Sequence, residues 1–315
     1  MTSGGDSPGM NAAARAVART ALYEGVDVYG VHNGYSGMVH DDIEQLTSRS
    51  VSDLIQRGGT FLGTARSKTF MTPEGRKTAY ENLCKRNIEG LVIIGGDGSL
   101  TGGSLLSKET GMPIVGLPGT IDNDVWGMDY TIGCDTACNT IVDAINKLRD
   151  TASAHRRVVV LEVMGRHCGD IALYSGVGGG AEAVLIPEIE ADVNRICRKI
   201  LQGAARGKLN SIIINAEGSG ISSDKLAKEI AAVTGRETRI VVLSYLQRGG
   251  VPTLDDRLLA SQSGAKAVEL IKTGIRNKAI GTVSGKIQAF EIEGALNEKC
   301  EFNHELYELI DVLSK

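Results

Sequence analysis

The chain has 315 residues, is 42% hydrophobic and 23% charged, and carries a formal net charge of −4 at pH 7. This length suits two domains or one large α/β domain, and the composition allows a sizeable core. The acidic balance argues against a general nucleic-acid binder, and no apolar run approaches the roughly 18 residues of a membrane span.

Short apolar runs alternate with longer helical patterns along the chain. The runs typical of strands lie, in chain order, at 26–31, 91–95, 113–117, 157–163, 183–187, 211–215, 239–245 and 279–283. The helical patterns lie at 9–24, 74–87, 135–153, 192–206, 223–234 and 255–273. Several strand candidates are apolar at nearly every position, as expected of parallel strands covered on both faces. The alternation predicts a doubly wound α/β fold with mostly parallel sheets.

The beginning of the chain departs from this pattern. A glycine-rich loop at 2–9 opens directly into a helix, and no apolar strand run precedes it. In a doubly wound sheet such a loop normally follows a strand. We therefore expect that the first strand is missing and that the recorded start lies several residues late.

The six cysteines do not form a metal-type pattern. Cys134 and Cys138 are four residues apart, with no second Cys or His pair nearby. A zinc site is therefore not expected, and the thiols are typical of a reduced, cytoplasmic protein.

The loops after the strands are the places to look for ligands, because ligands of open α/β sheets collect at the carboxyl ends of strands. They lie at 2–9, 57–66, 95–99, 119–124 and 163–170. Their glycines allow backbone N–H groups to approach a phosphate closely. Arg66 ends a Gly-Thr-Ala-Arg loop, Arg166 follows Gly165, and Arg248 precedes two glycines. Arginine binds phosphate oxygens in a bidentate manner, so each is a candidate anion ligand.

Two of these loops contain carboxylates. In "GGDGS", Asp97 would repel a phosphate unless a cation lay between them, which makes it a candidate Mg²⁺ ligand, although a tight turn is the alternative. The loop has neither the dinucleotide fingerprint nor the Walker sequence. In "GTIDND", Asp122 and Asp124 flank Asn123, which suggests a general base with an orienting partner, or else an Asp/Asn turn.

Taken together, the loops resemble those of the bacterial-type ATP-dependent 6-phosphofructokinases. The matching segments run nearly end to end: "SGGDSPGMNAA", "RGGTFLGTAR", "IGGDGS", "GLPGTIDND", "VMGRHCGD", "TGRETR" and "QRGG". The resemblance implies transfer of the γ-phosphoryl group of ATP to the 1-hydroxyl of fructose 6-phosphate in glycolysis.

The resemblance also assigns the residues of the active site. Asp122 matches the general base, Thr120 and Asp124 match neighbouring catalytic positions, and Arg166 contacts the transferring group. Asp97 matches the Mg²⁺ position. The ATP-binding positions are Gly5, Arg66, Ser67, Gly96, Asp97, Gly98 and Ser99. The fructose 6-phosphate positions are Thr120, Ile121, Asp122, Arg157, Met164, Gly165, Arg166, Glu217, Arg239, Tyr245 and Arg248.

The family pattern further implies a cytoplasmic homotetramer of two-domain subunits, with the active site in the cleft between the domains. The larger, ATP-binding domain would comprise 1–133 and 247–297, and the smaller, fructose 6-phosphate-binding domain 134–246 and 298–315. Arg157 and Arg239 would reach the substrate of the adjacent subunit. An effector site between subunits, for ADP as activator or phosphoenolpyruvate as inhibitor, would use Arg15, Arg19, Arg149, Gly180, Glu182, Arg206 and Lys208.

The chain departs from the family pattern in several places. Tyr245 stands where histidine is usual, so one 6-phosphate donor cannot carry positive charge. Ser67 replaces a larger residue beside the adenine. Ser48 stands where an effector arginine is common, and Leu209 and Asn210 replace a more basic pair. The strength and sign of the effector response therefore stay open.

The sequence argues against three other functions. Pyrophosphate-dependent relatives carry Asp at the position of Gly98 and Lys at that of Gly119, and both are glycine here. A non-catalytic sugar-phosphate sensor should lack the base or the metal ligand, yet Asp122 and Asp97 are both present. A nicotinamide-dependent oxidoreductase would need a different glycine spacing.

Overall fold

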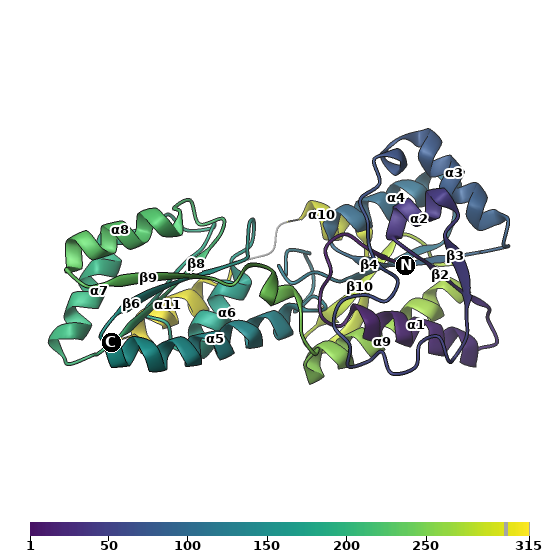
Figure 1. Ribbon diagram of the computed structural model, residues 1–315. Helices are drawn as coiled ribbons and strands as arrows, with labels where there is room; N and C mark the ends of the chain where they lie inside the picture. The colour runs from purple at the N-terminus through teal and green to yellow at the C-terminus, as the bar shows by residue number, and fades with distance from the viewer. Residues whose placement is uncertain (299–301, 315) are drawn as a thin grey trace. The chain divides into compact units, whose positions relative to one another are not determined.

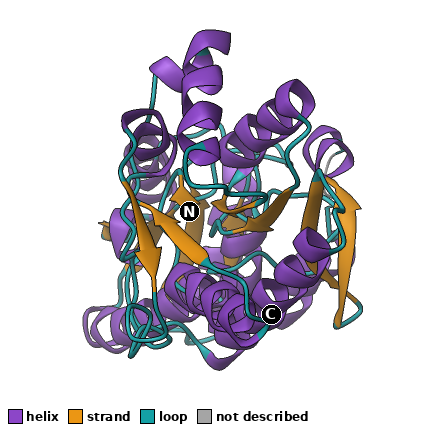
Figure 2. Ribbon diagram, turned by 90° about the vertical axis from the view of Figure 1, so that its right-hand side faces the viewer, coloured by secondary structure: helices purple, strands orange, loops and turns teal. Residues whose placement is uncertain are grey.

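The computed structural model describes residues 1–298 and 302–314, which form two compact units. The first comprises Met1–Thr136 and Arg248–Cys300, and the second Ala137–Gln247 and Glu301–Lys315. The expected domain boundaries fall at 133/134, 246/247 and 297/298, and the divisions between the units fall at 136/137, 247/248 and 300/301. Figure 1 labels the elements, and Figure 2 shows helices on both sides of the strands.

The first unit is built on a five-stranded sheet with the order β1-β4-β5-β10-β11. Its strands are β1 (Thr2–Ser3), β4 (Leu91–Gly95), β5 (Ile114–Pro118), β10 (Lys278–Val283) and β11 (Lys286–Glu291). The first four are parallel, and β11 returns antiparallel to β10. All five residues of β5 are buried, as expected of a central strand covered on both faces.

Helices cover both faces of this sheet. The helical elements of the unit are α1 (Met10–Tyr23), α2 (Gly34–His40), η1 (Thr69–Met71), α3 (Pro73–Cys84), α4 (Asp97–Thr110), α9 (Leu254–Lys272) and α10 (Ile292–Asn297). Side chains alternate between the faces of a strand, so Ile93 packs in one cluster with α4 residues and Ile94 in another with α1 and α9 residues. Helices α1 and α9 pack closely, because Gly264 leaves room for Ala13 and Ala16.

Two sequence-based expectations for this unit need correction. The run at 26–31 was expected as a strand of a mostly parallel α/β fold, but β2 (Val28–Val31) pairs antiparallel with β3 (Ile43–Leu46) in a separate two-stranded sheet. No strand was expected before the first glycine-rich loop, yet Thr2 and Ser3 pair in parallel with Ile94 and Gly95. This strand is two polar residues long, which is too short to show as an apolar run.

The second unit has a four-stranded, fully parallel sheet with the order β7-β8-β6-β9. Its strands are β6 (Val158–Val163), β7 (Ala183–Leu185), β8 (Ser211–Ala216) and β9 (Thr238–Val242). Its helical elements are α5 (Cys134–His155), α6 (Asp170–Gly179), α7 (Val193–Ala205), α8 (Ser223–Thr234), η2 (Ser244–Arg248) and α11 (His304–Leu313). Strand β9 ends before the expected run does, because Ser244 adopts a φ of 43° and begins η2, which contains Tyr245.

This arrangement agrees with the expected α/β class with mostly parallel sheets, and each predicted strand and helix overlaps an element of the structure. Among the described residues, no helix is both long and apolar enough to cross a membrane. Each unit therefore offers one edge at which parallel strands end and ligand-binding loops begin.

Candidate active site

The two acid-containing loops begin side by side at the carboxyl ends of β4 and β5. In the parallel register Gly95 pairs with Pro118, and the Gly119 N–H donates to the Gly95 carbonyl at 3.0 Å. A Cβ placed on Gly96 would lie 3.5 Å from the Cβ of Thr120. The sequence pattern predicts two strand ends that each carry an acid, and the pairing of β4 with β5 brings these two together.

The loop after β4 passes directly into helix α4. Asp97 lies in the first turn of this 14-residue helix and is exposed, and its carboxylate accepts from the Thr101 hydroxyl at 3.3 Å. Ser99 is buried beneath the turn, and its N–H donates to the Gly96 carbonyl at 2.9 Å. No atom lies within 4 Å of a Cβ placed on Gly98. An open glycine surface at a helix N-terminus can receive a phosphate group.

The loop after β5 is a turn that presents its acids at different depths. Asn123 is buried in the left-handed region, with φ 55°, and its Oδ1 accepts from the Thr131 N–H at 2.9 Å. The Thr131 hydroxyl donates to the Thr120 carbonyl at 2.6 Å. Asp122 is half-buried and Asp124 exposed, while Ile121 is buried in the core. This geometry suits Asp122 better than Asp124 as a partly desolvated base.

The loops at 2–9 and 57–66 lie against each other near the same sheet edge. The Thr64 hydroxyl donates to the Gly4 carbonyl at 2.7 Å, and the hydroxyls of Thr2 and Thr60 are 2.7 Å apart. The Arg248 guanidinium covers Gly5 so closely that a Cβ there would lie 2.1 Å from Nη1. Gly5 and Arg248 were assigned to ATP and to the 6-phosphate respectively, and the structure places them in contact.

Arg66 and Ser67, the other two residues expected at ATP, lie in different local environments. Arg66 is exposed, so its guanidinium is accessible to a ligand. The Ser67 hydroxyl accepts from the Phe70 N–H at 3.2 Å, in the turn that leads into the short helix η1. Ser67 therefore has a structural partner in addition to its expected place beside ATP.

In the second unit, a group of predicted sugar-phosphate residues gathers at the ends of β6 and β8. Arg166 Nε lies 3.6 Å from Glu217 Oε1, with 73% of the arginine side chain exposed. The Met164 N–H donates to the Gln247 side chain at 3.2 Å, and Gln247 is fully buried. Gly165 has a φ of +120°, and a Cβ there would lie 2.7 Å from the Cys168 carbonyl, so the sharp turn before Arg166 requires glycine.

Arg157 and Arg239 share one carboxylate. Arg157 Nε donates to Glu237 Oε2 at 2.7 Å, and Arg239 pairs with the other oxygen of Glu237. The hydrogen bond from Arg157, followed by that from Arg239, holds the pKa of Glu237 below its ordinary value. Tyr245 is 78% exposed on η2. The two arginines expected to serve a neighbouring subunit thus form one basic cluster, with side chains 28% and 63% exposed.

The predicted effector residues divide between the units. Arg149 donates to the carbonyls of Gly179 and Gly180 at 2.8 and 2.9 Å. Glu182 is 3% exposed, lies 2.5 Å from Lys208 Nζ and accepts from the Ile212 N–H. Its carboxylate thus already has protein partners. The other three are Arg206, exposed at the end of α7, and Arg15 and Arg19, partly exposed on α1 in the first unit.

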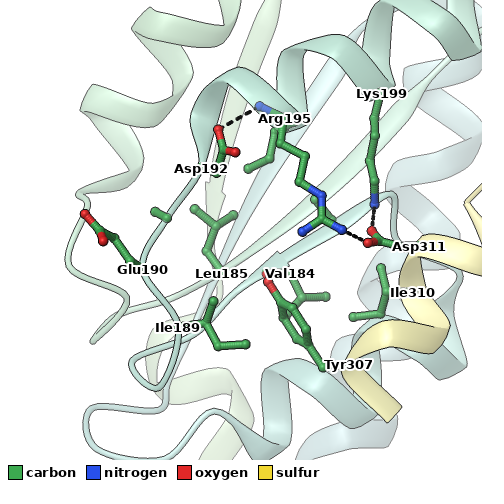
Figure 3. A pocket seen from close by; sticks show the side chains of 13 residues that line it. Val184, Leu185, Ile189, Glu190, Asp192, Arg195, Lys199, Tyr307, Ile310 and Asp311 are labelled. Atoms are coloured by element: carbon green, nitrogen blue, oxygen red, sulfur yellow. Dashed lines mark hydrogen bonds and ion pairs between the residues drawn. The ribbon is translucent and has the colours of Figure 1, made fainter. Parts of the chain in front are cut away.

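A pocket in the second unit contains none of the predicted site residues. It lies among β7, the segment before α7, α7 itself and α11, and Figure 3 shows Arg195 and Lys199 pointing toward Asp311. Asp311 pairs with both cations, and Lys199 also donates to the Glu182 carbonyl at 3.2 Å. The two cations of the pocket are therefore paired within the protein, and these ion pairs link α11 to α7.

The hydrogen bonds of three residues that shape the site could not be foreseen from the sequence. Gln247 and Asp256 bond to residues 83 and 123 positions away in the chain, and Thr131 bonds to residues 8 and 11 positions before it. For Asn123, its position between two acids was the one available hint.

Asp97 is the candidate metal ligand of the first unit. Among the described residues, no group of three or more His, Cys, Asp or Glu side chains could hold a metal ion. Mg²⁺ is commonly bound through one or two carboxylates together with substrate phosphates. The exposed carboxylate of Asp97, at a helix N-terminus beside open glycine surface, fits that mode of binding.

Comparisons with known proteins agree with this arrangement. A family model described as phosphofructokinase matches residues 1–271. An ATP-dependent 6-phosphofructokinase of Clostridium botulinum is 53% identical over 315 residues, which are 100% of this chain and 98% of the relative. A protein of the same name from Alkaliphilus metalliredigens is 53% identical over 314 residues, covering 100% of this chain and 98% of the relative.

Solved structures give the same picture. Phosphofructokinase from Saccharomyces cerevisiae superposes with a TM-score of 0.89 at 35% identity, over 94% of this chain. This chain spans 45% of the length of the yeast chain. A pyrophosphate-dependent phosphofructokinase from Marinobacter aquaeolei has a TM-score of 0.84 at 23% identity, over 96% of this chain and 84% of its own, which is a likeness of fold alone.

Proposed function

The chain belongs to the phosphofructokinase family, and on this premise we propose that it transfers the γ-phosphoryl group of ATP to the 1-hydroxyl of fructose 6-phosphate. The products are fructose 1,6-bisphosphate and ADP, as in the committed step of glycolysis. The observation that carries the proposal is the pairing of β4 with β5, which puts the loop of Asp97 beside the loop of Asp122. One acid can then serve a metal ion and the other a proton.

The chemistry assigned to the first unit is proton removal and nucleotide binding. A carboxylate oxygen of Asp122 takes the proton of the sugar's 1-hydroxyl group. As it does so, the hydroxyl oxygen bonds to the γ-phosphorus of ATP, and the bond between the γ-phosphorus and the oxygen that bridges it to the β-phosphate breaks, releasing ADP. Thr120 and Asp124 lie in the same turn, and Thr120 Oγ1 accepts from the Asp122 N–H at 3.3 Å, which orients the base. ATP binds over the glycine surface at Gly96 and Gly98, near Arg66.

Mg²⁺ is proposed as the metal, with Asp97 as its ligand directly or through water. When bound, it would neutralise charge on the phosphate oxygens of ATP. The residues that contact the sugar phosphate are proposed to be Met164, Gly165, Arg166 and Glu217 in the second unit, with Tyr245 and Arg248. A positive guanidinium at Arg166 also stabilises negative charge on the transferring group.

The choice of ATP over pyrophosphate is supported by two glycines. Space is open beside Gly98, so a nucleotide's inner phosphates meet no side chain there. A Cβ at Gly119 would lie 3.1 Å from Met10 Cε and 3.2 Å from Ile94 Cγ2, so a lysine at this position would require the neighbours to shift. The Asp and Lys expected of a pyrophosphate enzyme are therefore absent from both positions, and at Gly119 the neighbouring side chains also leave little room for a lysine.

We further propose that the enzyme is a cytoplasmic homotetramer regulated by ADP and phosphoenolpyruvate. The support is the resemblance of the sequence, together with basic residues that remain accessible. Arg206 is exposed and Arg15 partly exposed, as a phosphate-binding effector site requires. In this proposal Arg157 and Arg239 bind the 6-phosphate held by an adjacent subunit.

The proposal is tested by initial rates with fructose 6-phosphate and Mg²⁺, with ATP and pyrophosphate compared as phosphoryl donors. Formation of fructose 1,6-bisphosphate with ATP and not with pyrophosphate is the expected result. Product formed from pyrophosphate would reverse the interpretation of Gly98 and Gly119. Binding of fructose 6-phosphate to a folded tetramer without product from either donor would indicate a sensor.

A further inference from the structure

The carboxylate of Asp256 is buried at the junction of several segments of the first unit. It lies in the first turn of α9 and is 2% exposed. Its Oδ1 accepts from the Gly133 N–H at 2.7 Å, and its Oδ2 accepts from the Thr136 N–H at 2.8 Å and from the Thr136 hydroxyl. A side chain of one helix thus caps the N-terminus of another, α5, 120 residues earlier in the chain.

The capped segment leads directly back to the loop of the proposed base. The Ile132 N–H donates to the Pro118 carbonyl at 2.9 Å, and Ile132 forms a parallel bridge with Gly119. One residue earlier, Thr131 makes its two hydrogen bonds to Asn123 and Thr120, the residues on either side of Ile121 and Asp122. The segment 131–136 is therefore tied to the base loop at one end and to Asp256 at the other.

The same segment also contacts the first glycine-rich loop. The Ser7 hydroxyl donates to the Ile132 carbonyl at 2.8 Å. Gly133 has a φ of +107°, and a Cβ there would lie 2.6 Å from the Cβ of Ser7. This close packing restricts the path of the segment on one side. The hydrogen bonds from Gly133 and Thr136 to Asp256 restrict it on the other.

The buried carboxylate of Asp256 is subject to two opposing effects. Burial raises its pKa, against the hydrogen bonds from Thr136 and Gly133 that lower it. The opposing effects show that the carboxylate is costly to bury and that N–H and O–H donors compensate for the lost water. Thr253, the N-cap of α9, adds a hydrogen bond from its N–H to the Thr136 hydroxyl at 3.0 Å, so the network is cross-linked.

We propose that Asp256 is a positioning residue for phosphoryl transfer: by holding Gly133 and Thr136, it fixes segment 131–136 and, through Thr131, the loop that carries Asp122. The inference rests on the proposed function, in which Asp122 takes the substrate proton. It does not require Asp256 to touch either substrate. A displacement of the base by about 1 Å can cost about 100-fold in rate.

The test compares Asp256→Asn with Asp255→Asn, which changes the exposed neighbouring acid of the same helix turn. Asparagine keeps the shape but points an NH₂ group at donors. For Asp256→Asn we expect kcat to fall about 10- to 100-fold, with the KM for ATP and fructose 6-phosphate within about threefold of the wild type. The number of ATP sites per chain, measured by calorimetry, should be unchanged. A loss of sites parallel to the loss of kcat would indicate misfolding and overturn the proposal.

A second comparison separates positioning from general damage. Introduced into an Asp122→Ala background, Asp256→Asn should lower the residual rate far less than it lowers the wild-type rate, because the base that it positions is gone. An equal factor in both backgrounds would contradict the inference. Should Asp256→Asn fail to fold, Thr136→Val and Thr136→Ser form the substitute pair, since serine keeps the hydroxyl and valine removes it. Thr136→Val should lower kcat, and Thr136→Ser should keep kcat near the wild-type value.

Hydrogen exchange gives a readout that needs no activity. Peptides covering 119–136 should exchange faster in Asp256→Asn than in the wild type or in Asp255→Asn. If the wild-type protein transfers no phosphoryl group and Asp256→Asn still exchanges faster, the proposed function is refuted, while the inference that Asp256 positions this loop still holds. Unchanged exchange in an active enzyme would refute the positioning inference instead.

Discussion

At the scale of single residues, Asn123 explains why two carboxylates can stand so close together. Its left-handed backbone and its hydrogen bond from Thr131 form a turn that sends Asp122 and Asp124 to different environments. Asparagine tolerates this conformation better than most residues do. An Asp/Asn turn and a catalytic acid are therefore not alternatives here, because the turn is what separates the half-buried acid from the exposed one.

Replacing Asp122 tests the role of the half-buried acid. We expect Asp122→Ser to lower kcat by about 10²–10⁴-fold or more, with substrate binding nearly intact, because a general base contributes in this range. The matched variant Asp124→Ser should lose less, since that carboxylate is exposed. Steady-state rates and calorimetric binding of both substrates provide the measurement. A rate near wild type for Asp122→Ser would mean that Asp122 is only a turn residue.

At the scale of elements, the sequence predicts what depends on local pattern. The buried strands β4, β5, β6 and β8 appear as apolar runs, and the loops that follow the first two could be located at their ends. The partnership of β2 with β3 could not be predicted, because alternation in a strand does not reveal which strand pairs with it. The capping of α5 by Asp256 joins residues 120 apart, and no local spacing encodes such a contact.

The ion pair between Arg76 and Glu109 links helix α4, which carries Asp97, to α3 and η1. Arg76 on α3 is 7% exposed, donates to both carboxylate oxygens of Glu109 near the end of α4 at 2.8 and 2.6 Å, and donates to the Met71 carbonyl of η1 at 2.9 Å. The hydrogen bonds from Arg76 hold the pKa of Glu109 below its ordinary value of 4.5. Such bidentate pairs are among the stronger charged contacts in proteins.

Glu109→Gln should therefore destabilise the first unit in a pH-dependent way. Because the folded-state pKa of Glu109 is lowered, its contribution is present above pH 4.5 and is lost as the pH falls through the folded pKa. We expect a loss of about 1 kcal/mol in the free energy of unfolding at pH 7, since the carboxylate is partly exposed. Urea unfolding followed by Trp126, the single tryptophan, measures it.

A matched control is Glu81→Gln, whose carboxylate lies 4.0 Å from Lys77 and is 57% exposed. This variant should unfold within a few tenths of a kcal/mol of the wild type. A Glu109→Gln penalty that stayed constant down to the acid limit of folding would show that shape, and not charge, is what Arg76 requires.

At the scale of the whole molecule, the proposed effector response depends on basic residues that lie outside the proposed active site. Arg15→Ala should abolish the response to ADP and phosphoenolpyruvate without changing the maximal rate, because Arg15 is partly exposed on α1 and is not among the residues assigned to the active site. Fructose 6-phosphate saturation curves with and without each effector measure this. Lys77→Ala, at a side chain that is 77% exposed on α3, is the control. Normal responses in Arg15→Ala would remove it from the effector site.

The proposed sharing of active sites between subunits makes a stricter demand on the assembly. Arg239 pairs with Glu237 yet keeps 63% of its side chain exposed, so it is available to a neighbouring chain. If each site combines Asp122 of one chain with Arg239 of another, Asp122→Ser and Arg239→Ala chains refolded together should regain activity. Random mixing of equal amounts would restore about a quarter of the wild-type sites, since closed symmetric oligomers pair chains at equivalent interfaces.

The control for this experiment pairs Asp122→Ser with Glu217→Ala, because both residues are assigned to the same chain of a site. Every site of such a mixture then carries one of the two lesions, so mixing should restore nothing. Recovery in the first mixture and none in the second would establish that a neighbouring chain supplies Arg239. Recovery in neither, from mixtures that form tetramers, would mean that Arg239 serves its own chain, and a monomer could then be fully active.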